Sequence, residues 1–170
     1  QYRGWFQSSM LTSIAMKGVA PYKQILTHGW TVDGEGRAMH KSLGNAIPPE
    51  EVIKDYGADM LRLWVSSADY TQDMRISKEI LKQLSQAYLK IRNTARYMLG
   101  NLDGFDPNKD QVDYASLTAL DQWALGRMNE LVKVVRAAYD RYEFHAAYRA
   151  IYNFCVVDMS NFYLDIIKDR

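Results

Sequence analysis

The sequence predicts a mainly α-helical protein whose C-terminal part is an antiparallel helical bundle. From Ser77 onward, three long segments repeat apolar residues at three- and four-residue spacing, and such stripes bury best against one another. Residues 24–32 carry the β-branched and aromatic pattern of a strand. With 170 residues, 48% of them hydrophobic, the chain can form one ordinary core, or a small domain joined to part of another.

The N-terminal part predicts a helix, a strand and a tight turn, in that order. Residues 3–17 repeat apolar side chains at helical spacing, and Gly18 with Pro21 closes the run as a helix stop does. The stretch "QILTHGWTV", 24–32, follows as the strand. "DGEG" at 33–36 then supplies two turn signals.

Residues 46–76 predict a compact helical connector. Pro49 stands where the first turn of a helix tolerates proline, and Gly57 is expected to end that helix in a left-handed conformation. "ADMLRLWVSSA", 58–68, restarts the helical period, and "DYTQDMRI", 69–76, interrupts it.

The three helices of the bundle follow. Ser77 is a good N-cap for the first, which ends at Gly100. Residues 102–115 predict a loop, after which Ser116 is expected to cap the second helix, and the third spans 144–166. The apolar stripe of the first helix consists of Ile80, Leu84, Ala87, Ile91, Thr94 and Met98.

Composition narrows the class of protein. The chain has 21 Lys and Arg residues and 20 Asp and Glu residues, so its overall charge does not indicate what kind of partner it binds. The single cysteine, Cys155, excludes an internal disulfide, and with His28, His40 and His145 it is too scattered for a zinc ligand set. The sequence therefore predicts no metal site.

Location and extent can also be predicted. No apolar run reaches membrane-spanning length and no signal-peptide pattern opens the chain, which predicts a cytoplasmic protein without a membrane partner. Amphipathic sequence begins at once and stops inside "NFYLDIIKDR", whereas domains usually end in polar residues. We expect a piece of a longer protein.

The stretch "GEGRAMHKSLGN", 34–45, gathers glycines and cations directly after the predicted strand. A glycine-bounded loop can close over a phosphate chain, and an ammonium group at its tip can balance developing negative charge. A solvated lysine on a surface turn is the ordinary alternative. The stretch is neither a Walker loop nor a dinucleotide fingerprint.

Familiar motifs run along the whole chain. "AMHKSLGN", 38–45, resembles the "KMSKS" loop of class I aminoacyl-tRNA synthetases. The surrounding stretches "QYRGWFQSSMLTS", "THGWTVDGEGR", "VIKDYGADMLRLWVSSADYTQDMRIS", "KIRNTARYMLGNL" and "LDQWALGRMNELV" resemble isoleucyl-tRNA synthetase in particular. "RGWF" followed by "LRLWVSSADY" separates the chain from the valyl and leucyl relatives.

The resemblance implies three parts. Residues 1–45 would be the C-terminal remnant of a Rossmann-like α/β nucleotide-binding domain with its signature loop, 46–76 a connector, and 77–170 the start of the anticodon-binding bundle. The parent enzyme would be a cytoplasmic monomer that activates isoleucine with ATP and Mg²⁺ and transfers it to tRNA(Ile). The family's "HIGH" motif and editing domain are absent from these residues, so the chain alone is expected to be inactive.

The catalytic residues implied by the resemblance are Lys41 and Ser42, which would approach the ATP phosphates. The chain departs from the family at two positions, because Ala38 replaces the first lysine and His40 the first serine. Arg37 could reach the pyrophosphate in place of the missing lysine, or His40 could donate a hydrogen bond to it.

Four further residues are candidates for substrate binding. The resemblance places His28 and Gly29 beside the adenosine and Gln1 near the ATP ribose, whereas a histidine satisfied by neighbouring backbone is the alternative. Trp5 would form the aromatic wall of the isoleucine pocket, although a helical tryptophan can also be core.

Exposed cations on the bundle are candidates for tRNA phosphate contacts, with a solvated helix face as the alternative. They are Lys82, Lys90, Arg92, Arg96, Lys133 and Arg136. The tyrosines at 139, 142, 148, 152 and 163 could stack on bases, but several share the apolar stripes, which favours core packing. A non-catalytic tRNA-binding module and a helical scaffold are the competing hypotheses.

Overall fold

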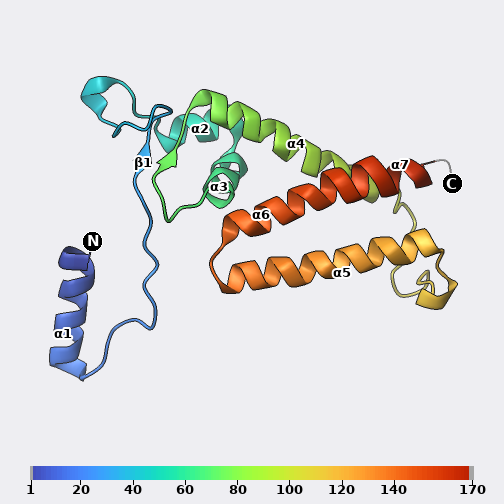
Figure 1. The fold of residues 1–170 in the computed structure, drawn as a ribbon, viewed down its shortest axis with the longest axis horizontal. Coiled ribbons are helices and arrows are strands. Elements are labelled where there is room, and N and C mark those ends of the chain that lie inside the picture. Colours follow the sequence, from blue (N-terminus) through green and yellow to red (C-terminus); the bar gives the residue numbers. More distant parts are fainter. Residues whose placement is uncertain (1, 169–170) are drawn as a thin grey trace.

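The computed structural model describes residues 2–168, and Gln1 therefore lies outside the described residues. The chain is mainly helical, with one short pair of strands (Figure 1). In order, the elements are the π-helical η1 (Tyr2–Phe6), α1 (Gln7–Lys17), β1 (Thr31–Val32), the 3₁₀ turn η2 (Lys41–Leu43), α2 (Pro49–Tyr56), α3 (Ala58–Ser67), β2 (Met74–Arg75), α4 (Lys78–Gly100), the 3₁₀ turn η3 (Tyr114–Ser116), α5 (Ala119–Asp140), α6 (Phe144–Asn153), the π-helical η4 (Phe154–Tyr163) and α7 (Leu164–Ile167).

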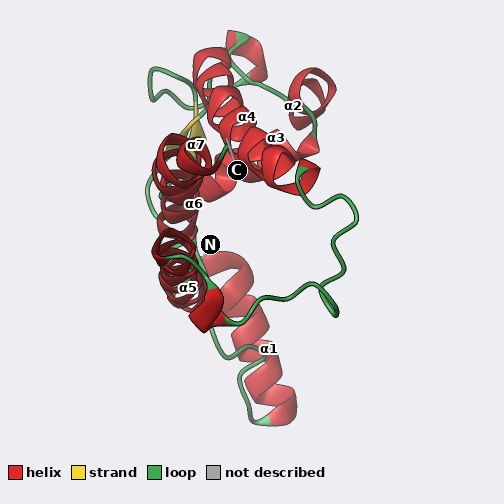
Figure 2. Ribbon diagram, turned by 90° about the vertical axis from the view of Figure 1, so that its right-hand side faces the viewer, coloured by secondary structure: helices red, strands yellow, loops and turns green. Residues whose placement is uncertain are grey.

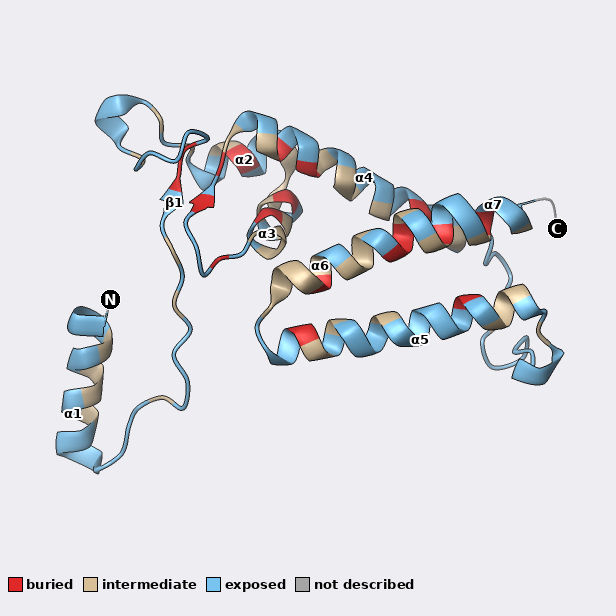
Figure 3. Ribbon diagram, in the orientation of Figure 1, coloured by how far each residue is buried: buried red, intermediate tan, exposed pale blue. Residues whose placement is uncertain are grey.

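The N-terminal helix stands away from the rest of the chain (Figures 1 and 2). Gly18 ends α1 in the left-handed conformation, with φ 71°, and its N–H donates to the carbonyl of Ile14, which confirms the predicted stop. Figure 3 shows that α1 carries no buried residue. An extended segment then leads to β1.

The predicted strand is much shorter than expected. Instead of 24–32, only Thr31–Val32 forms β1, which pairs in parallel with Met74–Arg75. The strand prediction was too long because periodicity identifies extended backbone, whereas a strand also needs a hydrogen-bonded neighbour. Within residues 2–168 the sheet has these two strands, so the Rossmann-like sheet stays a prediction.

The two helices predicted for the connector are present, and the connector supplies most of the first hydrophobic cluster. Pro49 opens α2, and Gly57 separates α2 from α3. Gly57 has φ 87° and ψ 159°, a region open to glycine alone but not the left-handed helical cap that we expected. The cluster is made by Val52, Met60, Trp64, Tyr70, Met74, Ile76, Leu81 and Leu84.

The long helix α4 carries the predicted cap and stripe. Ser77 accepts a hydrogen bond from the backbone N–H of Ile80 at 3.2 Å. Leu84 and Thr94 are buried as predicted, and Leu81, at 1% exposure, joins them. Glu51 of α2 pairs with Lys78 at 3.4 Å, which ties the connector to the start of α4.

The cap predicted for the second helix was wrong by two residues. Ser116 ends a 3₁₀ turn, and Thr118 is the N-cap of α5, where its hydroxyl accepts from the N–H of Asp121. Both residues are capping types, so composition alone could not separate them.

Helices α5 and α6 form a hairpin and enclose a second cluster together with α4 and η4 (Figures 1 and 3). Its buried residues are Ala124, Phe154, Cys155, Met159 and Leu164. Burial raises the pKa of the Cys155 thiol, which suits the core role its stripe predicted. None of the described helices is long and apolar enough to cross a membrane.

Candidate functional site

A buried aspartate closes the turn that precedes the signature loop, 38–45. Asp33 is 7% exposed, and its carboxylate accepts hydrogen bonds from the backbone N–H groups of Glu35 at 3.0 Å and Arg37 at 2.9 Å. The Arg37 Nε also donates to it at 2.9 Å. A carboxylate that caps two backbone amides fixes a turn that its glycines would otherwise leave loose.

Asn45 joins the two ends of the signature loop to this turn. Its Nδ2 donates to the Asp33 carboxylate at 2.9 Å and to the Ala38 carbonyl at 3.1 Å. Its Oδ1 accepts the backbone N–H of His40 at 2.9 Å. We name Asp33 and Asn45 the loop clamp, because together they hold both ends of the loop on one buried carboxylate.

The clamp presents Lys41 and Ser42 to solvent. Both are exposed and lie in the 3₁₀ turn Lys41–Leu43, which ends at Gly44 in the left-handed conformation with φ 64°. Among the described residues, Lys41 makes no ion pair. The loop therefore has a fixed base and an ammonium group at its tip that a ligand phosphate can take as a partner.

Arg37 is engaged at the base of the loop. It pairs with Asp33 at 2.9 Å and with Glu35 at 3.1 Å, although 63% of its side chain is exposed. The hydrogen bonds that the Arg37 backbone and side chain and the Asn45 side chain donate to Asp33 hold the pKa of Asp33 well below the usual range of a carboxyl group. An Arg37 that reached the pyrophosphate would have to leave this carboxylate.

A pocket of about 590 Å³ lies under the loop, between the turn and the starts of α2 and α4. Four of its lining residues are acidic, Asp33, Glu35, Glu51 and Glu79, against the two cations Arg37 and Lys78. A triphosphate would be repelled from this excess of negative charge. We therefore expect phosphates to approach the loop from its tip, where Lys41 lies.

A mainly apolar pocket of about 350 Å³ lies beside the "HG" motif. His28 and Thr31 line it from the β1 side, and Trp64, Tyr70 and Met74 line it from the connector. Its apolar walls can accept a flat ring, and the polar groups at its edge can fix that ring's orientation.

His28 also makes the backbone contact that was the alternative interpretation. Its Nδ1 lies 2.7 Å from the carbonyl oxygen of Gly29, which can only accept, so Nδ1 is assigned as the donor and the other ring nitrogen, Nε2, is left free to accept when it carries no proton. A ligand hydroxyl or amino group is the partner that such a ring nitrogen would take.

Gly29 is required where it stands. A Cβ on this residue would lie 2.2 Å from the carbonyl oxygen of Gln72, far inside contact distance. The Gly29 N–H donates to the carbonyl of Tyr70 at 2.8 Å, and the Trp30 N–H donates to Asp73 at 2.8 Å. The backbone of the motif is thus packed directly on residues 70–73.

Trp5 does not form a closed pocket wall among the described residues. It lies in η1 and is 75% exposed. Phe6, beside it, contacts Tyr22, whose hydroxyl donates to the Phe6 carbonyl at 2.9 Å. The isoleucine-pocket role of Trp5 stays a prediction.

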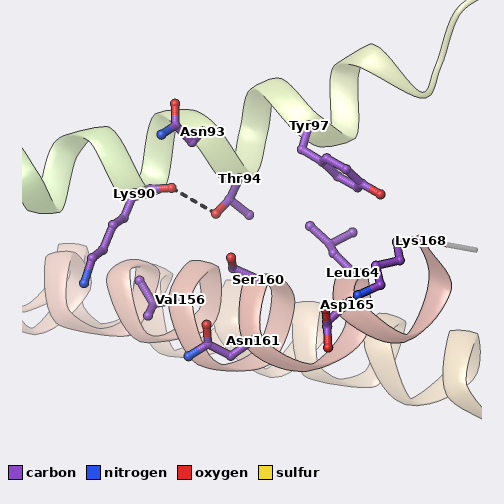
Figure 4. A pocket seen from close by; sticks show the side chains of 10 residues that line it. All are labelled: Lys90, Asn93, Thr94, Tyr97, Val156, Ser160, Asn161, Leu164, Asp165 and Lys168. Atoms are coloured by element: carbon purple, nitrogen blue, oxygen red, sulfur yellow. Dashed lines mark hydrogen bonds and ion pairs between the residues drawn. The ribbon is translucent and has the colours of Figure 1, made fainter.

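All six cations predicted for tRNA contact are exposed. Lys90 lies at a pocket of about 510 Å³ between α4 and the η4–α7 segment (Figure 4). Its ammonium group contacts the hydroxyl of Tyr152 at 3.3 Å and lies 5.9 Å from the centre of that ring. Lys133 lies 3.9 Å from Glu130, a loose surface pair.

The five candidate stacking tyrosines divide between core and surface. Tyr148 packs on the first cluster and Tyr163 on the second, as core residues do. Tyr139 and Tyr142 are 54% and 42% exposed and contact the ring of Phe144. Tyr152 is half-buried beside Lys90.

No group of three or more His, Cys, Asp or Glu within residues 2–168 is arranged to hold a metal ion. Asp33, the buried carboxylate at the base of the loop, is occupied by hydrogen bonds and an ion pair.

Sequence reasoning missed the loop clamp, although both of its residues carry a signal. An aspartate that opens an Asp-Gly turn often caps the following amides, and Asn45 ends the "LGN" of the signature loop. What the sequence does not show is that these two side chains meet across 12 positions.

Comparisons with known proteins show which family the chain resembles. The model of "tRNA synthetases class I (I, L, M and V)" matches residues 1–77, and "Anticodon-binding domain of tRNA ligase" matches residues 121–170. Over all 170 residues the chain is 62% identical to the isoleucine–tRNA ligase of Caldanaerobacter subterraneus and 59% identical to those of Caldicellulosiruptor bescii and Geobacter sulfurreducens. It spans 18% of the length of each. The resemblance to isoleucyl-tRNA synthetase that the sequence motifs carry is thereby confirmed over the whole chain.

Proposed function

We propose that this chain is the segment of an isoleucyl-tRNA synthetase that supplies the ATP-phosphate loop and the first helices of the tRNA-binding bundle. The observation that carries the proposal is the exposed Lys41 on a loop whose base is fixed by the clamp, Asp33 and Asn45. The 62% identity to an isoleucine–tRNA ligase over all 170 residues supports the same conclusion. Residues 1–45 would belong to the catalytic domain, 46–76 to the connector and 77–170 to the bundle.

The proposed reaction begins with attack of the isoleucine carboxylate on the α-phosphorus of ATP. The new C–O–P bond forms as the bond to pyrophosphate breaks, and the acyl group later passes to a ribose hydroxyl of the tRNA. Lys41 would stabilise the charge that develops on the leaving pyrophosphate, with Ser42 beside it. Such steps depend on alignment and charge stabilisation, so no nucleophilic side chain is needed.

The apolar pocket beside His28 would receive the adenosine. Its volume of about 350 Å³ lies in the range of small-molecule sites. The Nε2 acceptor of His28 would take a hydroxyl or amino hydrogen of the nucleoside. Gln1 near the ribose and Trp5 against the isoleucine side chain complete the proposed substrate contacts.

The bundle would hold tRNA through its phosphates. Contacts by exposed lysines and arginines position nucleic acid without reading its sequence. The proposed cations are Lys82, Lys90, Arg92, Arg96, Lys133 and Arg136, all of them exposed. A cytoplasmic location and a monomeric parent enzyme belong to the same proposal.

The alternative is a non-catalytic, tRNA-binding helical module. It accounts for the match of residues 121–170 to an anticodon-binding domain, but not for the match of residues 1–77 to class I synthetases. A non-catalytic module also leaves the loop clamp unexplained, because a tRNA-binding bundle does not need a fixed loop with an ammonium group at its tip.

A chimaera tests the proposal. In the Caldanaerobacter subterraneus ligase, the matching segment is replaced by these 170 residues, and we call the product the chain-swapped synthetase. We expect isoleucine-dependent exchange of pyrophosphate into ATP, at a rate within about tenfold of a control chimaera that carries the Caldicellulosiruptor bescii segment. The measurement is the exchange rate with isoleucine and with each other amino acid.

The control chimaera separates loss of function from a poorly tolerated swap. Exchange by the control but not by the chain-swapped synthetase would contradict the proposal. If the isolated chain then bound tRNA with an affinity that fell steeply with salt, the non-catalytic module would replace it.

A further inference from the structure

One exposed tyrosine makes hydrogen bonds from the helical bundle to two segments that precede it in the chain. Tyr142 lies at the tip of the α5–α6 hairpin, and its hydroxyl donates to Oε1 of Gln24 at 2.9 Å. Its backbone carbonyl accepts the hydroxyl of Tyr70 at 2.7 Å. Among the described residues, two hydrogen bonds connect the helices α5 to α7 with residues 2–76, and Tyr142 takes part in both.

The backbone of Tyr142 has a conformation that its side chain disfavours. Its φ is 59°, and among the residues from 2 to 168 it alone combines a positive φ with a side chain. The Glu143 N–H donates to the carbonyl of Ala138 at 2.8 Å, which places Tyr142 where a helix end usually has glycine or asparagine. A tyrosine at this position is strained, and the turn alone gives no reason for it.

The partner Tyr70 lies against the candidate nucleotide pocket. It is 8% exposed, its backbone carbonyl accepts the N–H of Gly29 at 2.8 Å, and its ring lies 5.8 Å from that of Phe144. Burial raises the pKa of the Tyr70 hydroxyl, which keeps it protonated as its donation to Tyr142 requires. Two hydrogen bonds thus separate the "HG" motif from the hairpin tip.

We propose that Tyr142 is a positioning residue for tRNA charging, which fixes the bundle on the connector through Tyr70 and on the catalytic part through Gln24. The inference rests on the proposed function. A tRNA held by bundle cations arrives at the adenylate with an orientation that the bundle sets. Formation of the adenylate itself needs no tRNA, so a loosened joint slows transfer and leaves activation alone.

The test uses the chain-swapped synthetase with Tyr142→Phe, Gln24→Met and both changes together. We expect each single variant to lower single-turnover transfer to tRNA about fivefold, the effect of one net hydrogen bond. The double variant should be no slower than either single one, because both remove the same contact. Pyrophosphate exchange and the KM for tRNA should stay within twofold.

One further variant is the control for this test. Tyr163→Phe removes a tyrosine hydroxyl bond inside the bundle, to Asp121 at 2.9 Å, and should leave the ratio of charging to exchange unchanged.

Three outcomes would overturn the proposal. Transfer could be unchanged in Tyr142→Phe, exchange could fall as much as transfer, or the double variant could show the product of the two single effects. If the chimaera without these substitutions showed no pyrophosphate exchange, the result would contradict the proposed function itself. It would then be distinguishable from a failure of the Tyr142 proposal alone.

Discussion

Replacing Lys41 with alanine is expected to lower the rate of isoleucyl-adenylate formation by about 10² to 10³, the usual cost of removing one group that stabilises developing negative charge. The effect should be large because Ala38 has already removed one of the two ammonium groups of the family's loop, and Arg37 is held by Asp33 and Glu35. The measurement is the adenylate burst of the chain-swapped synthetase at saturating ATP and isoleucine.

The matched control is Lys54→Ala in α2, which removes an exposed lysine of the neighbouring connector and should change the burst less than twofold. A Lys41→Ala burst within threefold of the unsubstituted enzyme would contradict a phosphate role for the loop tip. If Arg37→Ala instead carried the loss, Arg37 would be the pyrophosphate ligand in place of Lys41.

Replacing Gly29 with alanine is expected to open the β1–β2 pair. The added Cβ would lie 2.2 Å from the Gln72 carbonyl oxygen and 2.7 Å from the Asp73 nitrogen, and neither is a flexible side-chain end. A clash of this kind destabilises the strand pair by about 3 kcal/mol, which corresponds to roughly hundredfold faster hydrogen exchange of its backbone amides. The measurement is hydrogen exchange of the Met74 and Ile76 amides, whose bonds to Trp30 and Val32 hold the pair.

Gly126→Ala is the control for that experiment. Gly126 lies inside α5, and a Cβ there would meet nothing within 4 Å. Alanine should therefore leave the Met74 and Ile76 amides unchanged and stabilise the helix by roughly 0.5–1 kcal/mol. Unchanged protection of Met74 in Gly29→Ala would show that the two segments are not packed as described.

The helices could be predicted because local rules decide them. Ser77 caps α4 and Gly18 ends α1 as predicted, since each needs only its own neighbours in sequence. The strand 24–32 could not be predicted correctly, because the length of β1 depends on where Met74 and Arg75 lie. Ser116 failed as a cap because Thr118, two residues on, competes with it.

The sequence predicts some residues of the candidate site and leaves others out. The motif predicts roles for Lys41 and His28, because residue type and order carry that information. The contact between Asp33 and Asn45 depends on how the chain folds back, which no pattern encodes. Tyr142 was assigned to stacking or core packing, and its link to Gln24 spans 118 positions.

Chemical protection of Lys41 tests the central claim most directly. The chain-swapped synthetase is acetylated in limiting reagent, with and without ATP and isoleucine, and the modification of Lys41 and Lys54 is followed by mass spectrometry. If the loop tip contacts the phosphates, the substrates should slow acetylation of Lys41 about tenfold and leave Lys54 unchanged. Equal rates at Lys41 with and without substrates, in an enzyme that forms adenylate, would contradict the account.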